Sequence, residues 1–178
     1  MTFRLIALAS LYVLPLLAFG QNNAELAAMF AADQAARRGE NIDWSVISAE
    51  DAERREAVMS ILAAGKISTA QDYYNAAMIF QHGDSEADIR LAHSFATIAS
   101  ALGNTAAANW LKAASWDRLM LRFEQPQWYG TQYVRDASGR WVLYEVHPDA
   151  VTDEQRAAWS VPSLEEAQAR VAIMNGER

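Results

Sequence analysis

Two charged residues stand side by side in an otherwise apolar segment, shortly before a run of amides and aromatic rings. Asp117 and Arg118 lie within residues 110–123, where most other side chains are Trp, Leu, Met, Ala or Phe. A positioned carboxylate can act as a general acid or base, and a guanidinium can hold an anionic group. The candidate binding residues that follow are Gln127, Tyr129, Thr131 and Gln132. Because amides donate and accept hydrogen bonds and aromatic rings stack, this run suits a sugar or peptide ligand.

Each of these residues also has a structural explanation. A buried charge must be paired or hydrogen-bonded, so Asp117 and Arg118 could form a structural ion pair, or the carboxylate could cap a neighbouring loop. Glutamines at a helix-to-strand corner commonly satisfy loose backbone groups. We predict that Asp117 accepts hydrogen bonds from residues 127–132 and so fixes the corner against the helix.

The histidines provide further candidates. Gln81 and His82 end an expected helix, and His82 is a second candidate for catalysis or ligand binding, although the helix dipole alone favours a histidine there. No two of the three histidines are three or four residues apart, and cysteine is absent. The sequence therefore predicts neither a metal site nor a cofactor. It also contains no nucleophile elbow, phosphate-binding loop or dinucleotide fingerprint.

Composition limits the class of protein and its partners. The chain has 178 residues, of which 52% are hydrophobic and 21% charged, as in ordinary globular proteins. The formal net charge of −7 argues against nucleic acid as a partner, because an acidic chain repels phosphate backbones. The absence of cysteine excludes disulfides and thiol catalysis.

The first twenty residues are predicted to be a signal peptide. Residues 1–4 are basic, and the uncharged run over residues 5–19 is shorter than the roughly 20 apolar residues that span a bilayer. Ala18 and Gly20 are small residues at the positions required for cleavage before Gln21. We therefore expect a periplasmic or secreted protein with no membrane span after cleavage. An uncleaved N-terminal anchor is the alternative.

The elements that must position the candidate residues are mainly helical. Capping residues and single glycines predict helices over 22–38, 48–65, 69–83, 85–103 and 105–123, and Thr152 and Ser163 open two short ones. Segments 129–134 and 140–146 are rich in aromatic and branched residues, which predicts a β-hairpin. At 100° per residue, Trp110 shares a face with Ala114 and Leu121, and the other sides of that helix are also largely apolar, so it should be central.

Short connections favour neighbouring helices that pack as antiparallel hairpins. The expected fold is mainly α, a bundle of antiparallel helix hairpins that are degenerate and repeat-like, with one C-terminal β-hairpin at about 129–146. An irregular helical bundle is the alternative. We divide the chain into a signal peptide (1–20), an N-terminal helix and loop (21–48) and a helical domain (49–178).

Several segments together carry a family resemblance. They include the run 72–83, the Asp117–Arg118 pair, the element Gln127-x-Tyr129-Gly130-Thr131-Gln132, and residues 151–162. Over about residues 50–175 the chain resembles a bacterial family of domains of unknown function. The resemblance implies no activity, but it implies that His82, Asp117, Arg118, Gln127 and Gln132 belong to one constellation. Residues 107–114 are similar to the second helix of tetratricopeptide-type repeats.

Three functions fit these observations. The first is an exported helical binding or interaction module for a protein, peptide or glycan, because no complete catalytic motif is present. The second is a hydrolase acting on a cell-envelope polymer, with Asp117 as the acid or base and Arg118 as its partner or an anion clamp. Its substrate contacts would come from His82 and the 127–132 run. The third is an immunity or inhibitor protein whose acidic surface meets a basic partner.

Overall fold

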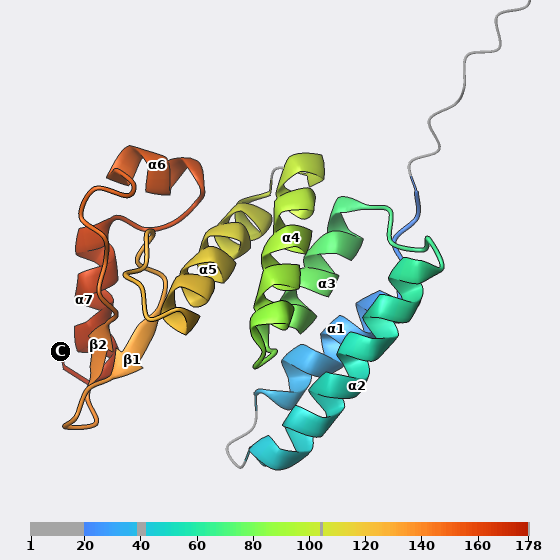
Figure 1. Ribbon diagram of the computed structural model, residues 1–178, viewed down its shortest axis with the longest axis horizontal. Coiled ribbons are helices and arrows are strands. Elements are labelled where there is room, and N and C mark those ends of the chain that lie inside the picture. Colours follow the sequence, from blue (N-terminus) through green and yellow to red (C-terminus); the bar gives the residue numbers. More distant parts are fainter. Residues whose placement is uncertain (1–19, 39–41, 104, 178) are drawn as a thin grey trace, which may run out of the picture.

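The computed structural model describes residues 20–38, 42–103 and 105–177 (Figure 1). Seven helices and one two-stranded sheet lie within these residues. In chain order they are α1 (Ala24–Ala36), α2 (Trp44–Ala63), α3 (Ala70–Gln81), α4 (Glu86–Gly103), α5 (Ala106–Arg122), β1 (Tyr133–Arg135), β2 (Trp141–Leu143), α6 (Asp153–Ala158) and α7 (Leu164–Met174).

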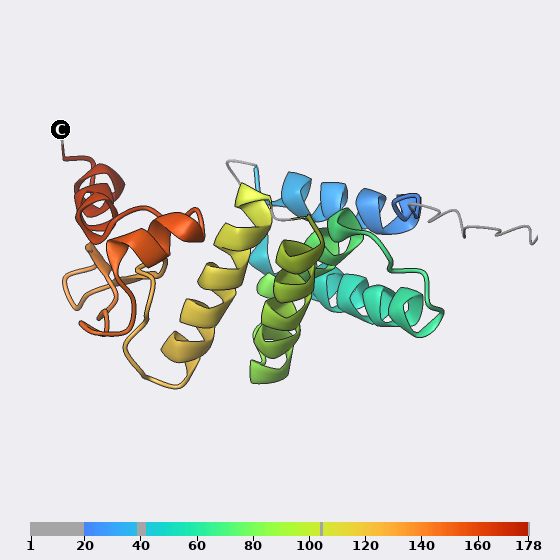
Figure 2. The same cartoon turned by 90° about the horizontal axis from the view of Figure 1, so that it is seen from above.

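The helices pack as adjacent pairs along an elongated array. α1 and α2 lie at one end, α3 to α5 follow, and the hairpin with α6 and α7 forms the other end (Figures 1 and 2). The predicted class, mainly α with paired helices and a C-terminal hairpin, is confirmed. None of the helices in the described ranges has both the length and the apolar character to cross a membrane. The predicted signal peptide lies outside the described residues except for Gly20.

Small side chains on α4 allow its neighbours to approach closely. Ala92, Ala96 and Ala99 are fully buried, and α4 packs against both α3 and α5. The main core combines Ala92 and Ala96 with Leu26, Val58, Ile79, Phe80 and Leu111. A second, smaller core lies at the C-terminal end around Ala113, Tyr129 and Val161. The prediction that α5 is central is confirmed for its middle turns, where Leu111, Ala114 and Leu119 are buried. Trp110 in the second turn is 40% exposed, not buried.

The helix ends show where local capping decides the structure. The predicted capping boxes at Thr69, Thr152 and Ser163 are all present. The predicted start of α2 at Ser48 is wrong, because Asp43 accepts hydrogen bonds from the next backbone N–H groups and starts the helix at Trp44. The boundary placed after residue 48 therefore falls inside α2.

The hairpin is shorter than predicted. Val134 pairs with Val142 at its centre, and only three residues of each strand pair. Residues 129–132 do not extend β1, because the N–H groups of Tyr129 and Thr131 donate to Asp117 and are not free for a strand partner. The hairpin packs on α7, with the Tyr133 hydroxyl donating to the Ala167 carbonyl oxygen at 3.1 Å.

Candidate functional site

Asp117 holds the corner between α5 and the hairpin, as its sequence position predicted. Its side chain is 0% exposed. The carboxylate accepts from the N–H groups of Trp128 at 2.8 Å, Tyr129 at 3.0 Å and Thr131 at 3.0 Å, and from the Thr131 hydroxyl at 2.8 Å. Burial raises the pKa of Asp117, and these hydrogen bonds act in the opposite direction. Every acceptor position of the carboxylate is directed at the corner.

Arg156 of α6 holds the same corner through its carbonyl groups. Its guanidinium donates to the oxygens of Tyr129 at 3.1 Å and Trp128 at 3.0 Å, and it forms an ion pair with Asp153. The side chain is only 4% exposed. Sequence reasoning did not assign this role, although the Thr152 capping box that positions α6 was visible. The backbone of residues 128–129 is therefore fixed by a buried carboxylate on its N–H groups and a buried guanidinium on its carbonyls.

Gln127 completes the corner from within. Its amide donates to the carbonyl oxygens of Gln132 at 3.0 Å and Tyr144 at 2.8 Å, and its side-chain oxygen accepts from the Gln132 N–H at 2.8 Å. Gln127 is fully buried. Gly130 between these residues has φ +83°, a conformation that favours glycine. Gln127 and Thr131, two of the predicted binding residues, thus serve the corner itself.

Arg118 points away from its neighbour Asp117. Successive residues of a helix are separated by 100°, and the two side chains form no ion pair with each other. Arg118 donates to the Gly83 carbonyl oxygen at 3.3 Å, in the connection between α3 and α4. The structural ion pair considered from the sequence is therefore not formed.

Arg118 lines two cavities that also share Asp84. One, of about 390 Å³, lies between Arg37, Ser48, Asp51, His82, Asp84 and Arg118. The other, of about 450 Å³, lies between Gly83, Asp84, Arg118, Arg122, Gln132 and Tyr133. We call the two cavities together the Arg118 groove.

The charge of Arg118 is only partly compensated, through the nearby carboxylate of Asp84. Within the described ranges, its only hydrogen bond is to Gly83, and no ion pair is formed. The other arginines that are buried or half-buried there are all ion-paired: Arg37, Arg54, Arg55 and Arg156. Burial lowers the pKa of Arg118, as does nearby Arg122, while Asp84 acts to raise it.

A buried network supports the His82 side of the groove. Asp33 is 0% exposed and lies 3.0 Å from His82 Nδ1 and 2.9 Å from Arg37 Nη1. Arg37 also bonds Asp51. Although burial acts to raise it, the pKa of Asp33 lies below its ordinary value of 3.8 because His82, Gln34 and Arg37 stabilise the carboxylate. The i,i+4 spacing of Asp33 and Arg37 was visible in the sequence, but their contact with His82 depends on the packing of α1 on α3.

The predicted site residues therefore do not meet in one cleft. His82 and Gln132 line different cavities of the Arg118 groove, and Arg118 lines both. Asp117, Gln127 and Thr131 are turned into the corner. The oxygen of the Gln81 side chain is buried without a hydrogen-bond partner in the described part of the chain.

Tyr129 belongs to a separate aromatic pocket of about 210 Å³. We define the aromatic pocket by its lining side chains, which are His93, Trp116, Trp128, Tyr129 and Trp159. Tyr129 stacks on Trp159 with ring centroids 4.9 Å apart, and Trp116 meets Trp128 edge to face at 4.9 Å. Burial and the charge of Asp117 raise the pKa of Tyr129 to about 12. Its hydroxyl is therefore neutral at ordinary pH.

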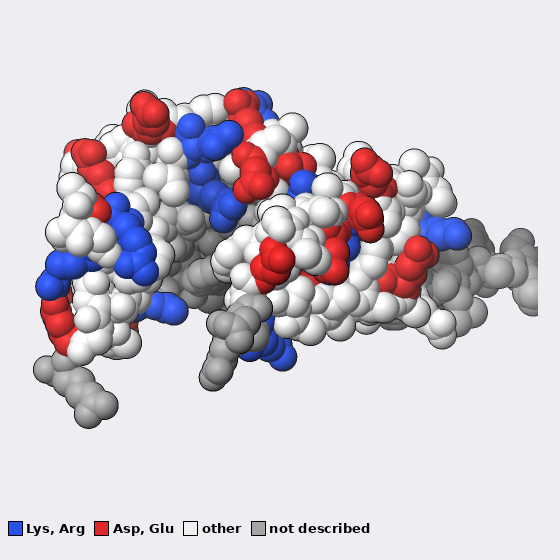
Figure 3. All heavy atoms as spheres, turned by 90° about the horizontal axis from the view of Figure 1, so that it is seen from below, with Lys and Arg blue, Asp and Glu red and all other residues white. Residues whose placement is uncertain are grey.

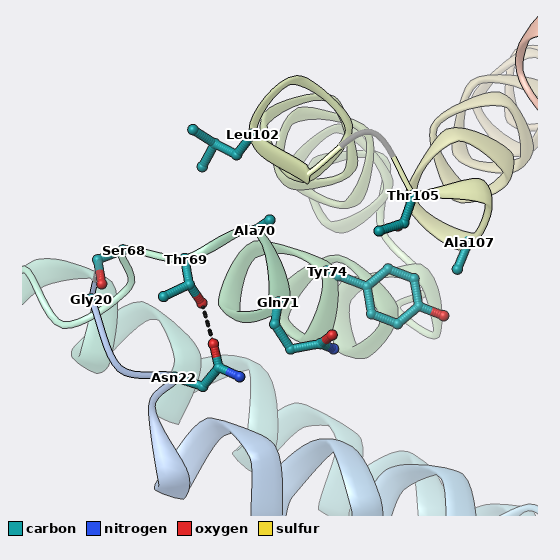
Figure 4. A pocket seen from close by; sticks show the side chains of 10 residues that line it. All are labelled: Gly20, Asn22, Ser68, Thr69, Ala70, Gln71, Tyr74, Leu102, Thr105 and Ala107. Atoms are coloured by element: carbon teal, nitrogen blue, oxygen red, sulfur yellow. Dashed lines mark hydrogen bonds between the residues drawn. The ribbon is translucent and has the colours of Figure 1, made fainter. Parts of the chain in front are cut away.

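A further cavity, of about 700 Å³, contains none of the predicted site residues. It lies between the starts of α1, α3 and α5 and the end of α4 (Figure 4). Asn22 and Thr69 are joined by a hydrogen bond of 2.8 Å at one end, and Tyr74 lies at the other. No charged side chain lines it, so it offers no group for acid–base work or for holding an ion.

The described residues contain no group of three or more His, Asp or Glu side chains arranged to hold a metal ion. On the face of the molecule that Figure 3 shows, acidic and basic side chains are interspersed and do not form a face of one sign. No family model matches this chain, and comparison with curated proteins and with solved structures also gave no match. The family resemblance seen in the sequence stays a prediction.

Proposed function

We propose that this protein is an exported helical binding module, and that the Arg118 groove takes a ligand carrying a carboxylate or phosphate group. The observation that carries the proposal is Arg118, a half-buried guanidinium that lines both cavities and has no carboxylate partner among the described residues. A charge held away from bulk water needs compensation. A guanidinium presents paired N–H donors that match an oxyanion.

Arg122 supports the same assignment. It follows Arg118 by four residues on α5, and both line the larger cavity. Like charges at this spacing repel each other, although the helix dipole favours Arg122 in the last turn of α5. A bound oxyanion would relieve the repulsion. Asp84, which lines both cavities, and Glu124, which lines the larger one, weaken the positive field, but neither forms an ion pair with Arg118.

The position of Asp117 favours binding over the hydrolase hypothesis in its original form. Its carboxylate is fully buried, and its acceptor positions are occupied by corner donors. It lines neither cavity of the Arg118 groove. A general acid or base must reach the substrate, directly or through one water. Asp117 is therefore better placed to hold the corner than to transfer protons.

A second candidate function rests on His82. Its Nδ1 contacts the buried Asp33 at 3.0 Å, and its ring lines the same cavity as Arg118. A histidine oriented by a buried carboxylate is the arrangement of a general base. Hydrolysis of an ester or phosphodiester would then use His82 as the base and Arg118 as the anion holder. No observation specifically favours the immunity or inhibitor hypothesis.

The binding proposal is tested by isothermal titration calorimetry at low ionic strength, with inorganic phosphate and succinate as the two titrants. We expect saturable binding of at least one anion. Arg118→Gln should weaken it about tenfold or more, because a charge-assisted pair is lost. Asp84→Asn should tighten it, since a competing negative charge is removed. The two anions distinguish a phosphate ligand from a carboxylate ligand.

Arg90→Gln is the matched control, because Arg90 is exposed and already paired with Glu86 on α4. Equal anion binding by the wild type and by Arg118→Gln would overturn the proposal. Chromogenic ester and phosphodiester substrates test the second candidate. Turnover by the wild type that is lost in His82→Gln would favour hydrolysis over simple binding.

A further inference from the structure

The aromatic pocket is built from four separate parts of the chain. His93 comes from α4, Trp116 from α5, Trp128 and Tyr129 from the corner, and Trp159 from the residue that follows α6. Its walls include the Tyr129–Trp159 and Trp116–Trp128 ring pairs. The ring centroids of His93 and Trp116 lie 5.5 Å apart. Hydrophobic cores are close-packed and contain few voids. A cavity between five rings therefore needs an explanation of its own.

The pocket is held rigid by the buried charges of the corner. Trp128 and Tyr129 carry two of its rings, and their backbone groups are fixed by Asp117 on one side and Arg156 on the other. Fixing aromatic side chains before a ligand arrives reduces the entropy lost on binding. The elaborate hydrogen bonding of the corner thus maintains the shape of an aromatic cavity.

Charge on the pocket walls argues against a cationic ligand. The ammonium group of Lys112 already lies 3.4 Å from the ring centroid of Trp159. A second cation would be repelled by Lys112 and would find this ring face occupied. Burial lowers the pKa of His93, so its imidazole is neutral and adds no charge to the pocket.

Polar atoms on the walls argue for a ligand with hydroxyl groups. His93 Nδ1 lies 3.1 Å from the Lys112 carbonyl oxygen, which assigns the proton to Nδ1 and leaves Nε2 as an acceptor. The indole N–H of Trp116 is buried and has no hydrogen-bond partner among the described residues. Rings that stack and a few hydrogen-bonding atoms are the combination that suits a sugar.

We propose that the aromatic pocket is a binding site for one neutral sugar ring, separate from the Arg118 groove. Its volume of about 210 Å³ lies below the roughly 300–1,000 Å³ of sites for drug-sized ligands, so it fits a single ring and not an extended chain. Trp116 and Arg118 lie on different sides of α5, 200° apart at 100° per residue, and no residue lines both sites. The sugar site does not rest on the function proposed for Arg118.

The test is a titration of the ¹⁵N-labelled protein with methyl β-glucoside and with N-acetylglucosamine. The indole N–H signals in NMR spectra report binding. Three of the six tryptophans line the pocket: Trp116, Trp128 and Trp159. The others serve as internal controls: Trp44, Trp110 and Trp141. We expect saturable shifts confined to the first set. Saturable shifts for neither sugar, or equal shifts in both sets, would overturn the proposal.

Two variants and two further probes sharpen the result. Trp159→Leu should weaken sugar binding about tenfold or more, whereas Trp110→Leu, at an exposed tryptophan outside the pocket, should leave it unchanged. Choline and p-cresol are titrated in parallel as a cation and an aromatic ring. Tighter binding of either probe than of both sugars would contradict the ligand class. If Trp159→Leu does not fold, the wild-type indole signals still decide.

Discussion

Replacing Asp117 by Asn removes the charge of a fully buried carboxylate but keeps its shape. In the wild type, one carboxylate oxygen accepts from the N–H groups of Trp128 and Tyr129, and the other accepts from the N–H and hydroxyl of Thr131. Asparagine offers one oxygen and one NH₂ group. Whichever way the amide is turned, at least one backbone N–H of the corner then faces a donor.

The size of the effect follows from these contacts. A buried donor left without an acceptor costs about 1–3 kcal/mol. The remaining bonds also weaken, because a neutral oxygen replaces a charged one. Burial of the charge acts in the other direction, since it raises the pKa of Asp117 and disfavours the ionised form. The net loss should be about 1–3 kcal/mol in the free energy of unfolding, or about 2–12 °C in Tm for a chain of this size.

The assay is a thermal melt followed by circular dichroism, with urea unfolding to obtain the free energy. Asp149→Asn is the matched control, because Asp149 is exposed and its side chain forms no ion pair or hydrogen bond with any described residue. The control should melt within about 1 °C of the wild type, as expected for an isolated surface change. If Asp117→Asn is as stable as the wild type, or more stable, the structural role assigned to Asp117 is refuted. Its charge would then be held at a cost, as at many functional sites.

Three further outcomes are expected. Gly130→Ala should cost about 1–2 kcal/mol in urea unfolding, since φ is +83° while the added methyl would meet only ordinary contacts; an unchanged midpoint would contradict this. Tyr144→Ala should lower stability by about 1–3 kcal/mol in a thermal melt, because the half-buried ring helps to anchor the hairpin; an unchanged Tm would mean that the ribbon projects freely. Because the pKa of Asp33 is lowered, its contribution is present above pH 3.8 and is lost as pH falls through the folded-state pKa. The wild type should therefore lose more stability than Asp33→Asn between about pH 5 and pH 2, and parallel pH profiles would exclude this role of Asp33.

The helical frame could be predicted wherever a local contact defines it. Thr69, Thr152 and Ser163 each bond the backbone three residues later, so sequence spacing alone finds these helix starts. The pattern at Ser48 and Asp51 has the same spacing but does not cap a helix. Asp51 is instead bound by Arg37 from α1 and by Arg54. The helix starts further upstream, at the N-cap residue Asp43, whose side chain accepts from the N–H groups of Ser45 and Val46.

The candidate site divides in the same way. The hydrogen bonding of Asp117 could be predicted, because a charge on an apolar helix needs donors and the corner is the nearest source. The role of Arg156 could not, because it depends on how α6 folds back over residues 128–129. The contact of His82 with Asp33 joins residues 49 positions apart and likewise requires the packed helices. The strand predicted over 129–134 begins only at Tyr133, because the N–H groups of Tyr129 and Thr131 donate to Asp117.

The Asp117–Arg118 pair explains why adjacent charged residues need not share a function. A rotation of 100° per residue sends one side chain into the corner and the other towards the connection between α3 and α4. Asp117 acts on Trp128 and Tyr129, and so on the aromatic pocket, through their backbone. Arg118 acts on the groove directly. The two residues therefore act on different cavities on different sides of α5, and substitution of either residue should affect its own cavity more than the other.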